Sequence, residues 1–237
     1  MSAPATLILA IDTTGARGSV ALVSKAGVIE EAELDSPDGF AHVLFGEIEA
    51  LLARAGVAMG DISAFASAAG PGSFTGVRVG LTAVKGLAEA TGRRAVAVSN
   101  LQALASFGSG PLRAVAIDAR RGEIYGAVYN AALEPVHEEI VTKFEAWLSS
   151  LPKRELEFIG IQVTRGAGGD PVAEADVRAP VFDPPRALAG AIGRIALDRL
   201  ELGLARDPAE IDANYVRRSD AELLWKDPAL EKGSQAR

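Results

Sequence analysis

The sequence predicts a two-lobed, duplicated α/β fold with a reduced second lobe. Apolar segments typical of buried strands alternate with segments of helical period along most of the chain. A strand that ends in an acidic turn occurs twice, at residues 10–12 and again at residues 116–118. Two strands and a helix are predicted after each acidic turn in the same order, which indicates two lobes that face each other.

The first part of the chain predicts the element order β-β-β-α-β-α-β. The segments that predict strands are residues 6–11, 19–23, 28–34, 62–69 and 95–98. Apolar residues recur at helical spacing from Phe40 to Ala55, and Gly56 is the predicted C-terminal cap of this helix. A glycine-rich loop at residues 70–76 leads into a second helix, which runs to Ala90 and is capped by Gly92.

The rest of the chain predicts a shorter lobe and a C-terminal helix. The predicted elements are strands at residues 114–118, 124–129 and 136–141 and helices at 144–151 and 187–204. Pro185 suits the first position of the last helix, because Pro has no N–H to leave unpaired there. We therefore divide the chain into a first lobe, a reduced second lobe, and a C-terminal helix and tail that pack back on the first lobe: residues 1–108, 109–184 and 185–237.

The composition is that of an ordered protein and excludes several kinds of site. The chain has 237 residues, of which 49% are hydrophobic, and this is ample material for a buried core. The absence of Cys excludes disulfides, thiolate zinc sites and a cysteine nucleophile. Two His residues, His42 and His137, are too few for a three-His zinc site and cannot form an H-E-x-x-H helix.

The charge balance is acidic, because 31 Asp and Glu residues outnumber 24 Lys and Arg residues and give a formal net charge of −7. This argues against a protein that grips nucleic acid through its general surface, since phosphate binding needs clustered cations. No apolar run approaches the roughly 18 residues that span a bilayer, and no basic region precedes the first apolar stretch. We therefore expect a cytoplasmic protein with no membrane contact.

A specific motif lies at residues 70–80, which read GPGSFTGVRVG. This segment resembles the TsaB family, which supplies a partner subunit in bacterial tRNA threonylcarbamoyladenosine synthesis. Further segments that resemble this family are residues 9–14, 19–22, 116–120, 122–125 and 215–217. The resemblance covers nearly the whole chain and is weakest between about residues 150 and 185. It implies the fold shared by actin, hexokinase and the sugar kinases (the ASKHA fold).

The resemblance also implies a function without catalysis. Family members bind and activate a paralogue, TsaD, which carries the metal, binds ATP and transfers threonylcarbamoyl to the adenosine next to the anticodon in tRNA. A small ATPase, TsaE, joins that assembly. We therefore expect no catalytic residue, no metal site and no intrinsic cofactor in this chain, and contact with tRNA only through the complex. The paralogue carries paired metal-binding histidines on its first helix, whereas this helix offers only His42, which cannot hold a metal alone.

Since the family pairs its first two helices with those of the partner, we predict the interface there. Gly76 and Gly80 lie four residues apart on one helix face, where small residues would let a partner helix approach closely. Arg78 would lie near this seam as an ion-pair donor. Packing of the same glycines within the chain is the alternative. The predicted interface residues are Phe40, Val43, Leu44, Phe45, Glu47, Ile48, Phe74, Gly76, Val77, Arg78, Gly80 and Leu81.

A second candidate site combines the first acidic turn with the glycine-rich loop. Its candidate phosphate or nucleotide contacts are Asp12, Thr13, Thr14, Gly70, Gly72 and Ser73. Alternatively, Asp12 only caps its own turn, and Ser73 or Thr75 only caps the second helix. The loop is not a Walker A motif, because Thr75 and Gly76 occupy the positions of its second glycine and lysine.

Other readings stay open. A small-molecule kinase or ATPase would use Asp12, the loop at residues 70–76, and Asp118 as its base. A peptidase is disfavoured, because the chain has no Cys and no well-placed His. A homodimer would use the apolar face of the first helix on a second copy.

Two further segments have open roles. The segment 118–123 is either a second phosphate turn or a salt-bridged hairpin. Contacts with tRNA or a partner are a further hypothesis for Tyr215, Arg217 and Arg218.

Overall fold

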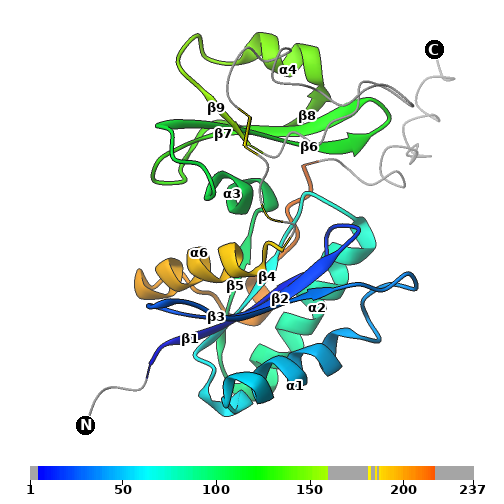
Figure 1. Cartoon of the computed structure of the whole chain (residues 1–237), viewed down its shortest axis with the longest axis vertical. Helices are drawn as coiled ribbons and strands as arrows, with labels where there is room; N and C mark the ends of the chain where they lie inside the picture. The colour runs from blue at the N-terminus through cyan, green and yellow to red at the C-terminus, as the bar shows by residue number, and fades with distance from the viewer. Residues whose placement is uncertain (1–4, 160–180, 183–184, 186, 217–237) are drawn as a thin grey trace, which may run out of the picture.

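The computed structural model describes residues 5–159, 181–182, 185 and 187–216, and this part folds into two lobes, each built on a five-stranded sheet (Figure 1). The strand orders are β3-β2-β1-β4-β5 in the first sheet and β10-β9-β6-β7-β8 in the second. Each sheet contains three antiparallel strands followed by two parallel ones. This shared pattern confirms the predicted duplicated, two-lobed fold.

The elements follow the predicted order, with α3, β9, β10 and two short 3-10 turns as additions. The first sheet consists of β1 (Leu7–Asp12), β2 (Gly18–Ser24), β3 (Gly27–Leu34), β4 (Ala64–Ala68) and β5 (Arg94–Val98). The second consists of β6 (Leu112–Arg120), β7 (Glu123–Asn130), β8 (Pro135–Lys143), β9 (Glu157–Ile159) and β10 (Val181–Phe182). The helices of the described part are α1 (Leu44–Ala55), α2 (Phe74–Thr91), α3 (Asn100–Ala105), α4 (Phe144–Ser150) and α6 (Ala189–Glu201), with short 3-10 turns η1 (Met59–Asp61) and η2 (Pro208–Glu210).

The central strand of the first sheet, β1, is buried on both faces. Leu7, Leu9 and Ile11 pack with residues of α1 and α2 in one core cluster. Ile8 and Ala10 pack with residues of α6 in another. Side chains alternate between the two faces of a strand, so a strand that is covered on both sides needs apolar residues throughout. This explains the continuous apolar run at the start of the chain.

The first helix is shorter than its sequence period predicts. α1 begins at Leu44, because the residues from Phe40 onward form a turn in which the Phe40 carbonyl accepts hydrogen bonds from the N–H groups of Val43 and Leu44. Phe40 still packs in the core, and this produces the helix-like spacing. The predicted C-terminal caps are confirmed, since Gly56 ends α1 with φ 66° and Gly92 ends α2 with φ 64°.

The second lobe has a core of its own between its sheet and α4. Trp147 is completely buried there, and its ring meets that of Phe158 edge-on at a centroid distance of 6.3 Å. The additional helix α3 lies between this lobe and the first one (Figure 1) and packs on β6 and β7. It has six residues, which is too short for helical periodicity to show in the sequence.

The C-terminal helix packs on the first sheet, against β1, β2 and β4. It begins at Ala189, so the prediction that Pro185 is its first residue is wrong. The cause is a contact distant in sequence: the Ser19 hydroxyl of β2 accepts hydrogen bonds from the N–H groups of Leu188 and Ala189, at 3.2 and 3.0 Å. The side chain that fixes the start of α6 therefore lies about 170 residues away.

Some sequence predictions fall outside the described residues. These concern residues 160–180, Arg217 and Arg218, and the polar end of the chain. Within the described ranges, none of the helices has the length and apolar character needed to cross a membrane.

Candidate functional site

The acidic turn after β1 is buried and folded onto itself. Asp12 is 3% exposed, and its Oδ1 accepts hydrogen bonds from the Thr14 N–H at 2.9 Å and the Thr14 hydroxyl at 2.6 Å. Burial raises the pKa of Asp12, while the hydrogen bonds from Thr14 and Asn100 act in the opposite direction. Asp12 therefore caps its own turn by bonding to Thr14.

Asn100 joins this turn to the glycine-rich loop. Its side-chain amide donates to the Thr14 hydroxyl at 2.6 Å, and its side-chain oxygen accepts from the Gly70 N–H at 3.0 Å. The N–H of Ser73 donates to the carbonyl of Thr14 at 2.7 Å. The structure therefore brings the two predicted turns together. Sequence reasoning missed Asn100, although Ser99 and Asn100 directly after a predicted strand are typical of a helix N-terminus.

The predicted phosphate contacts differ in accessibility. Asp12, Thr13, Thr14 and Gly70 are buried, whereas Gly72 and Ser73 are exposed. The Ser73 hydroxyl accepts a hydrogen bond from the Gly76 N–H at 3.2 Å, which confirms Ser73 as the cap of α2. A phosphate or nucleotide contact at this turn stays a prediction.

The prediction that Gly76 and Gly80 face a partner helix is wrong. Both glycines are buried against the first sheet. The Thr13 hydroxyl donates to the Gly76 carbonyl at 2.6 Å, and a Cβ on Gly76 would overlap the Thr13 carbonyl oxygen. A Cβ on Gly80 would lie 2.8 Å from the Thr13 hydroxyl and 3.0 Å from the hydroxyl of Ser67 on β4. These glycines therefore let α2 approach its own sheet.

The other predicted interface residues divide into two groups. Five are buried in the first lobe's core: Phe40, Leu44, Ile48, Val77 and Leu81. Phe45, Phe74 and Arg78 are exposed, and Val43 and Glu47 are half-buried. Phe45 is 55% exposed, so a large aromatic side chain lies in solvent on the outer side of α1.

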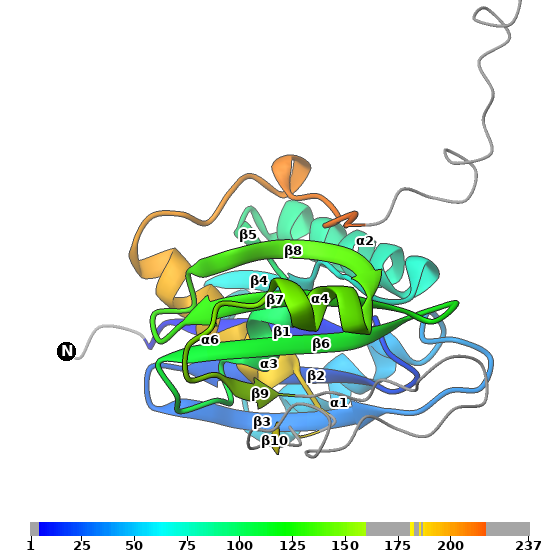
Figure 2. The same cartoon turned by 90° about the horizontal axis from the view of Figure 1, so that it is seen from above.

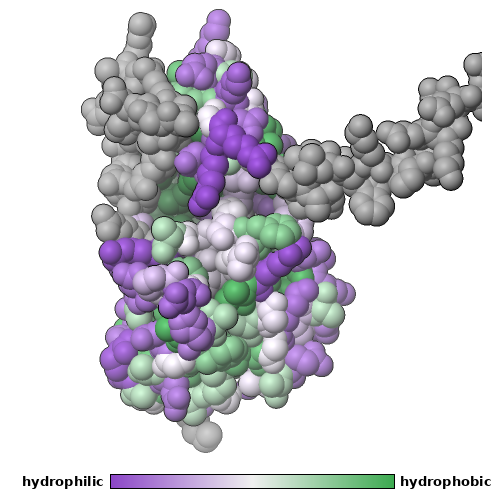
Figure 3. All heavy atoms as spheres, turned by 90° about the vertical axis from the view of Figure 1, so that its right-hand side faces the viewer, coloured by the Kyte–Doolittle hydropathy of each residue, from purple (hydrophilic) through white to green (hydrophobic). Residues whose placement is uncertain are grey.

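An apolar groove of about 640 Å³ lies between the outer sides of α1 and α2. We call it the α1–α2 groove, and its lining residues are Ala41, Leu44, Phe45, Thr75, Arg78, Val79, Thr82, Ala83, Gly86 and Leu87. The space-filling view shows apolar residues gathered on a face of the first lobe between hydrophilic ones (Figure 3). An exposed apolar patch bordered by polar residues marks an interaction site more often than a scattered apolar residue does.

One end of this groove carries a stacked cation. The Arg78 guanidinium lies 3.6 Å from the centroid of the Phe74 ring, and the Tyr215 ring lies 5.7 Å from the Phe74 ring between centroids. Both aromatic rings are more than two-fifths exposed. We call these three side chains the aromatic ladder. Tyr215, which the sequence offers only as a speculative contact, is thereby placed beside the groove.

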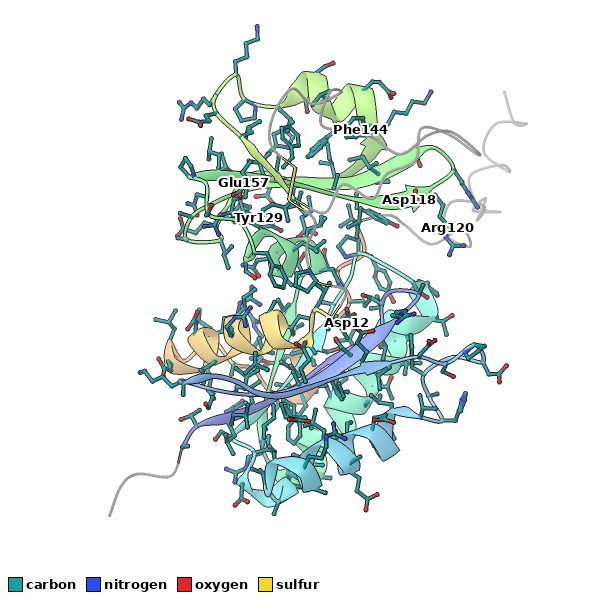
Figure 4. The ribbon with its side chains drawn as sticks, viewed as in Figure 1. Asp12, Asp118, Arg120, Tyr129, Phe144 and Glu157 are labelled. Carbon is teal, nitrogen blue, oxygen red and sulfur yellow. The ribbon has the colours of Figure 1, made fainter. Side chains whose placement is uncertain are left out.

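The second acidic turn is the tip of the β6–β7 hairpin. Asp118 accepts a hydrogen bond from the Arg120 N–H at 2.7 Å, and Arg120 and Arg121 have φ of 62° and 59°. Asp12 lies on the side of the first lobe that faces the second, whereas Asp118 belongs to the second lobe (Figure 4). The hairpin is confirmed, and the choice between an ion-paired hairpin and a phosphate turn stays open.

The two histidines lie in different lobes. His42 lies just before α1, and its Nε2 atom is 3.2 Å from the Ser36 hydroxyl. His137 is half-buried on the edge strand β8. Within the described ranges, no group of three or more His, Asp or Glu side chains is arranged to hold a metal ion.

Comparison with known proteins identifies the family. The family model "TsaD: tRNA N6-adenosine threonylcarbamoyltransferase" matches residues 38–164. The chain is 34% identical over 234 residues to the tRNA threonylcarbamoyladenosine biosynthesis protein TsaB of Bacillus subtilis, with 92% of this chain and 97% of that protein covered.

Solved structures agree with this assignment. YeaZ from Pseudomonas aeruginosa superposes with a TM-score of 0.72 at 28% identity and covers 89% of this chain and 99% of that one. The activator of the 2-hydroxyisocaproyl-CoA dehydratase from Clostridium difficile superposes with a TM-score of 0.51 at 10% identity, and the match covers 84% of this chain and 97% of the activator. At this low identity, the likeness shows only that the two chains share a fold. The chain has the actin- and sugar-kinase-like fold and belongs to the TsaB family of tRNA threonylcarbamoyladenosine biosynthesis proteins.

Proposed function

We propose that this chain is the non-catalytic partner subunit that binds and activates a TsaD-type transferase, for threonylcarbamoyl transfer to the adenosine next to the anticodon in tRNA. The observation that carries the proposal is the α1–α2 groove, which exposes Phe45 beside an apolar lining formed by two neighbouring helices. The match of a TsaD family model supports a partner of the same fold.

The division of labour follows from the side chains that each subunit needs. Asp12 is turned inward and bonded to Thr14, which leaves the acidic turn poorly placed for a reacting phosphate. Two histidines in separate lobes do not make the paired-histidine ligand set expected on the paralogue's first helix. We therefore assign ATP and the metal to the partner. A TsaE-type ATPase and tRNA join through the complex.

Activation by docking needs a difference in affinity. A subunit shifts its partner towards the active arrangement only if it binds that arrangement more tightly than the inactive one. The groove suits this role, because it is formed by two helices that are anchored on a sheet through Leu44, Ile48 and Val77. A rigid docking face can hold a flexible partner lobe in one position.

Phe45→Glu tests the proposal. We expect this variant to weaken binding to the purified, metal-loaded TsaD-type paralogue by at least about 30-fold, since a central aromatic anchor is typically worth about 2 kcal/mol or more. Isothermal titration calorimetry measures the affinity. Leu202→Glu is the matched control, because Leu202 is 73% exposed in the loop after α6 and lies outside the groove.

The outcomes separate the alternatives. Absence of binding by a paralogue that is folded and metal-loaded would overturn the partner-subunit proposal. If the Phe45→Glu variant and the parent chain bind the paralogue with equal affinity, the interface with the paralogue does not lie at the groove. If the chain alone forms a concentration-dependent dimer that Phe45→Glu dissociates, and this dimer persists when the paralogue is added, the groove is a homodimer interface instead.

A further inference from the structure

A short C-terminal segment links the groove to the second lobe. We call residues 211–216 the strap. Ile211, which is 3% exposed, anchors it in the core of the first lobe. The N–H of Asn214 donates to the carbonyl of Ala69, next to the end of β4, at 2.8 Å. The strap rises from the first sheet towards the second lobe (Figure 1) and runs beside α2 when seen from above (Figure 2).

On one side, the strap extends the α1–α2 groove. Tyr215 stacks on Phe74, and Phe74 supports the guanidinium of Arg78, which lines the groove. Arg78 forms no ion pair with any side chain in the described ranges. A stacked guanidinium is held in place while its N–H groups remain free, which suits a carboxylate. The aromatic ladder therefore fits a partner with an apolar surface and an acidic side chain.

On the other side, the strap is bonded to the second lobe. The side-chain amide of Asn214 donates to the Glu139 carboxylate on β8 at 2.6 Å. The same carboxylate accepts hydrogen bonds from the Tyr129 hydroxyl on β7, at 2.5 Å, and from the Ser99 hydroxyl at the start of α3. One carboxylate thus joins the second sheet, the segment between the lobes and the strap.

We propose that the strap is a third component of the docking surface beside α1 and α2, and that Glu139 positions it, so that the second lobe controls how tightly the partner binds. This inference rests on the proposed function. Asn214 and Tyr215 are consecutive, so the hydrogen bond from Asn214 to Glu139 holds the stretch of backbone that carries the Tyr215 ring. Coupling between two sites is reciprocal, and partner binding must therefore stabilise the contact at Glu139 by the same free energy.

The experiment compares two strap variants with a control outside the strap. We expect Tyr215→Ala and Asn214→Ala each to weaken binding of the metal-loaded TsaD-type paralogue by about tenfold in calorimetry, within the range usual for coupled sites. Leu202→Glu is again the control, because Leu202 is 73% exposed in the loop after α6 and lies outside both the groove and the strap. It should bind like the parent chain.

A second readout separates positioning from general damage to the fold. Partner binding should slow amide hydrogen exchange in β8 of the parent chain and of Leu202→Glu, but not of Asn214→Ala. Glu139→Ala should behave like Asn214→Ala. Glu139→Gln should restore most of the affinity, because the Asn214 amide can flip and accept from the new Gln side chain.

Failure of the inference differs from failure of the proposed function. If the parent chain does not bind the paralogue, the proposed function is overturned and this inference falls with it. If the parent chain binds but the strap variants bind equally well, or exchange in β8 does not respond to the partner, the strap is not part of the surface, and the docking proposal stands.

Discussion

Asp12 and Asn100 show how single residues decide the character of the first turn. A lone acidic residue after a strand is compatible with phosphate binding, yet here its oxygen is occupied by Thr14 and its surroundings exclude water. Asn100 completes the arrangement from the far side of the glycine-rich loop. The turn therefore acts first as a structural joint between β1 and that loop.

Asp12→Asn should stabilise the protein at neutral pH. Burial raises the pKa of Asp12 in the folded state, so folding favours its protonated form. The stability that this carboxyl contributes is fully present below the pKa of the unfolded chain and is lost as the pH rises through the folded pKa. Asn keeps the oxygen that accepts from Thr14 and carries no charge.

Thermal unfolding of both proteins between pH 4 and pH 7.5 measures this effect. The advantage of the variant should be largest at neutral pH and shrink towards the acidic end. A variant that is less stable than the parent chain at pH 7 would show that the charged carboxylate is needed.

At the scale of elements, α2 has two faces with opposite requirements. Its inner face uses Gly76 and Gly80 to approach β1 and β4, whereas its outer face lines the groove with Arg78 and other side chains. Gly86 also lies on the outer side, where a Cβ would meet nothing within 4 Å. Close contacts with the sheet therefore explain why Gly76 and Gly80 are glycines, whereas no such contact explains Gly86.

Gly80→Ala should lower the free energy of unfolding by about 1–3 kcal/mol, because the new methyl group would press on the hydroxyls of Thr13 and Ser67. Gly86→Ala should raise it by about 0.5–1 kcal/mol, since Ala has the higher helix propensity. Urea denaturation of the two variants and the parent chain measures both. Equal effects of the two substitutions would contradict the inward orientation of Gly80.

At the scale of the whole molecule, one carboxylate connects parts that are far apart in the sequence. Glu139 bonds to Tyr129 of β7, to Ser99 before α3 and to Asn214 of the strap. The two lobes are therefore joined by side-chain hydrogen bonds as well as by the chain connections between them. Burial, followed by the neighbouring charge of Glu139, raises the pKa of Tyr129, so its hydroxyl stays protonated and donates to Glu139 across the physiological range.

Tyr129→Phe should lower the free energy of unfolding by about 1.5–3 kcal/mol at pH 7, since it removes a hydrogen bond to a charged group and leaves the carboxylate less well paired. Urea denaturation measures the change. The raised pKa adds a second expectation: the stability that this phenol contributes is present below its unfolded pKa and is lost at alkaline pH. The loss should be seen in the parent chain and be smaller in the variant.

The sequence alone determined the duplicated fold, the strands β1 to β8, the glycine caps of α1 and α2, and the family. These depend on patterns among neighbouring residues: apolar runs, helical spacing, Gly56, Gly92 and the motif at residues 70–80. The sequence also indicated that α1 and α2 carry exposed apolar residues. Periodicity reports that a side chain is apolar, but it does not report which surface covers that side chain.

Only the tertiary structure decided which residues of α1 and α2 face the sheet and which face solvent. In the structure, Gly80 faces the sheet and Phe45 faces solvent. The helix α6 begins at Ala189, where the Ser19 hydroxyl of β2 accepts a hydrogen bond from the Ala189 N–H. The tertiary structure also brought Glu139 to Asn214, 75 residues away in the chain. Contacts of this kind depend on how whole elements pack, and no local pattern in the sequence encodes them.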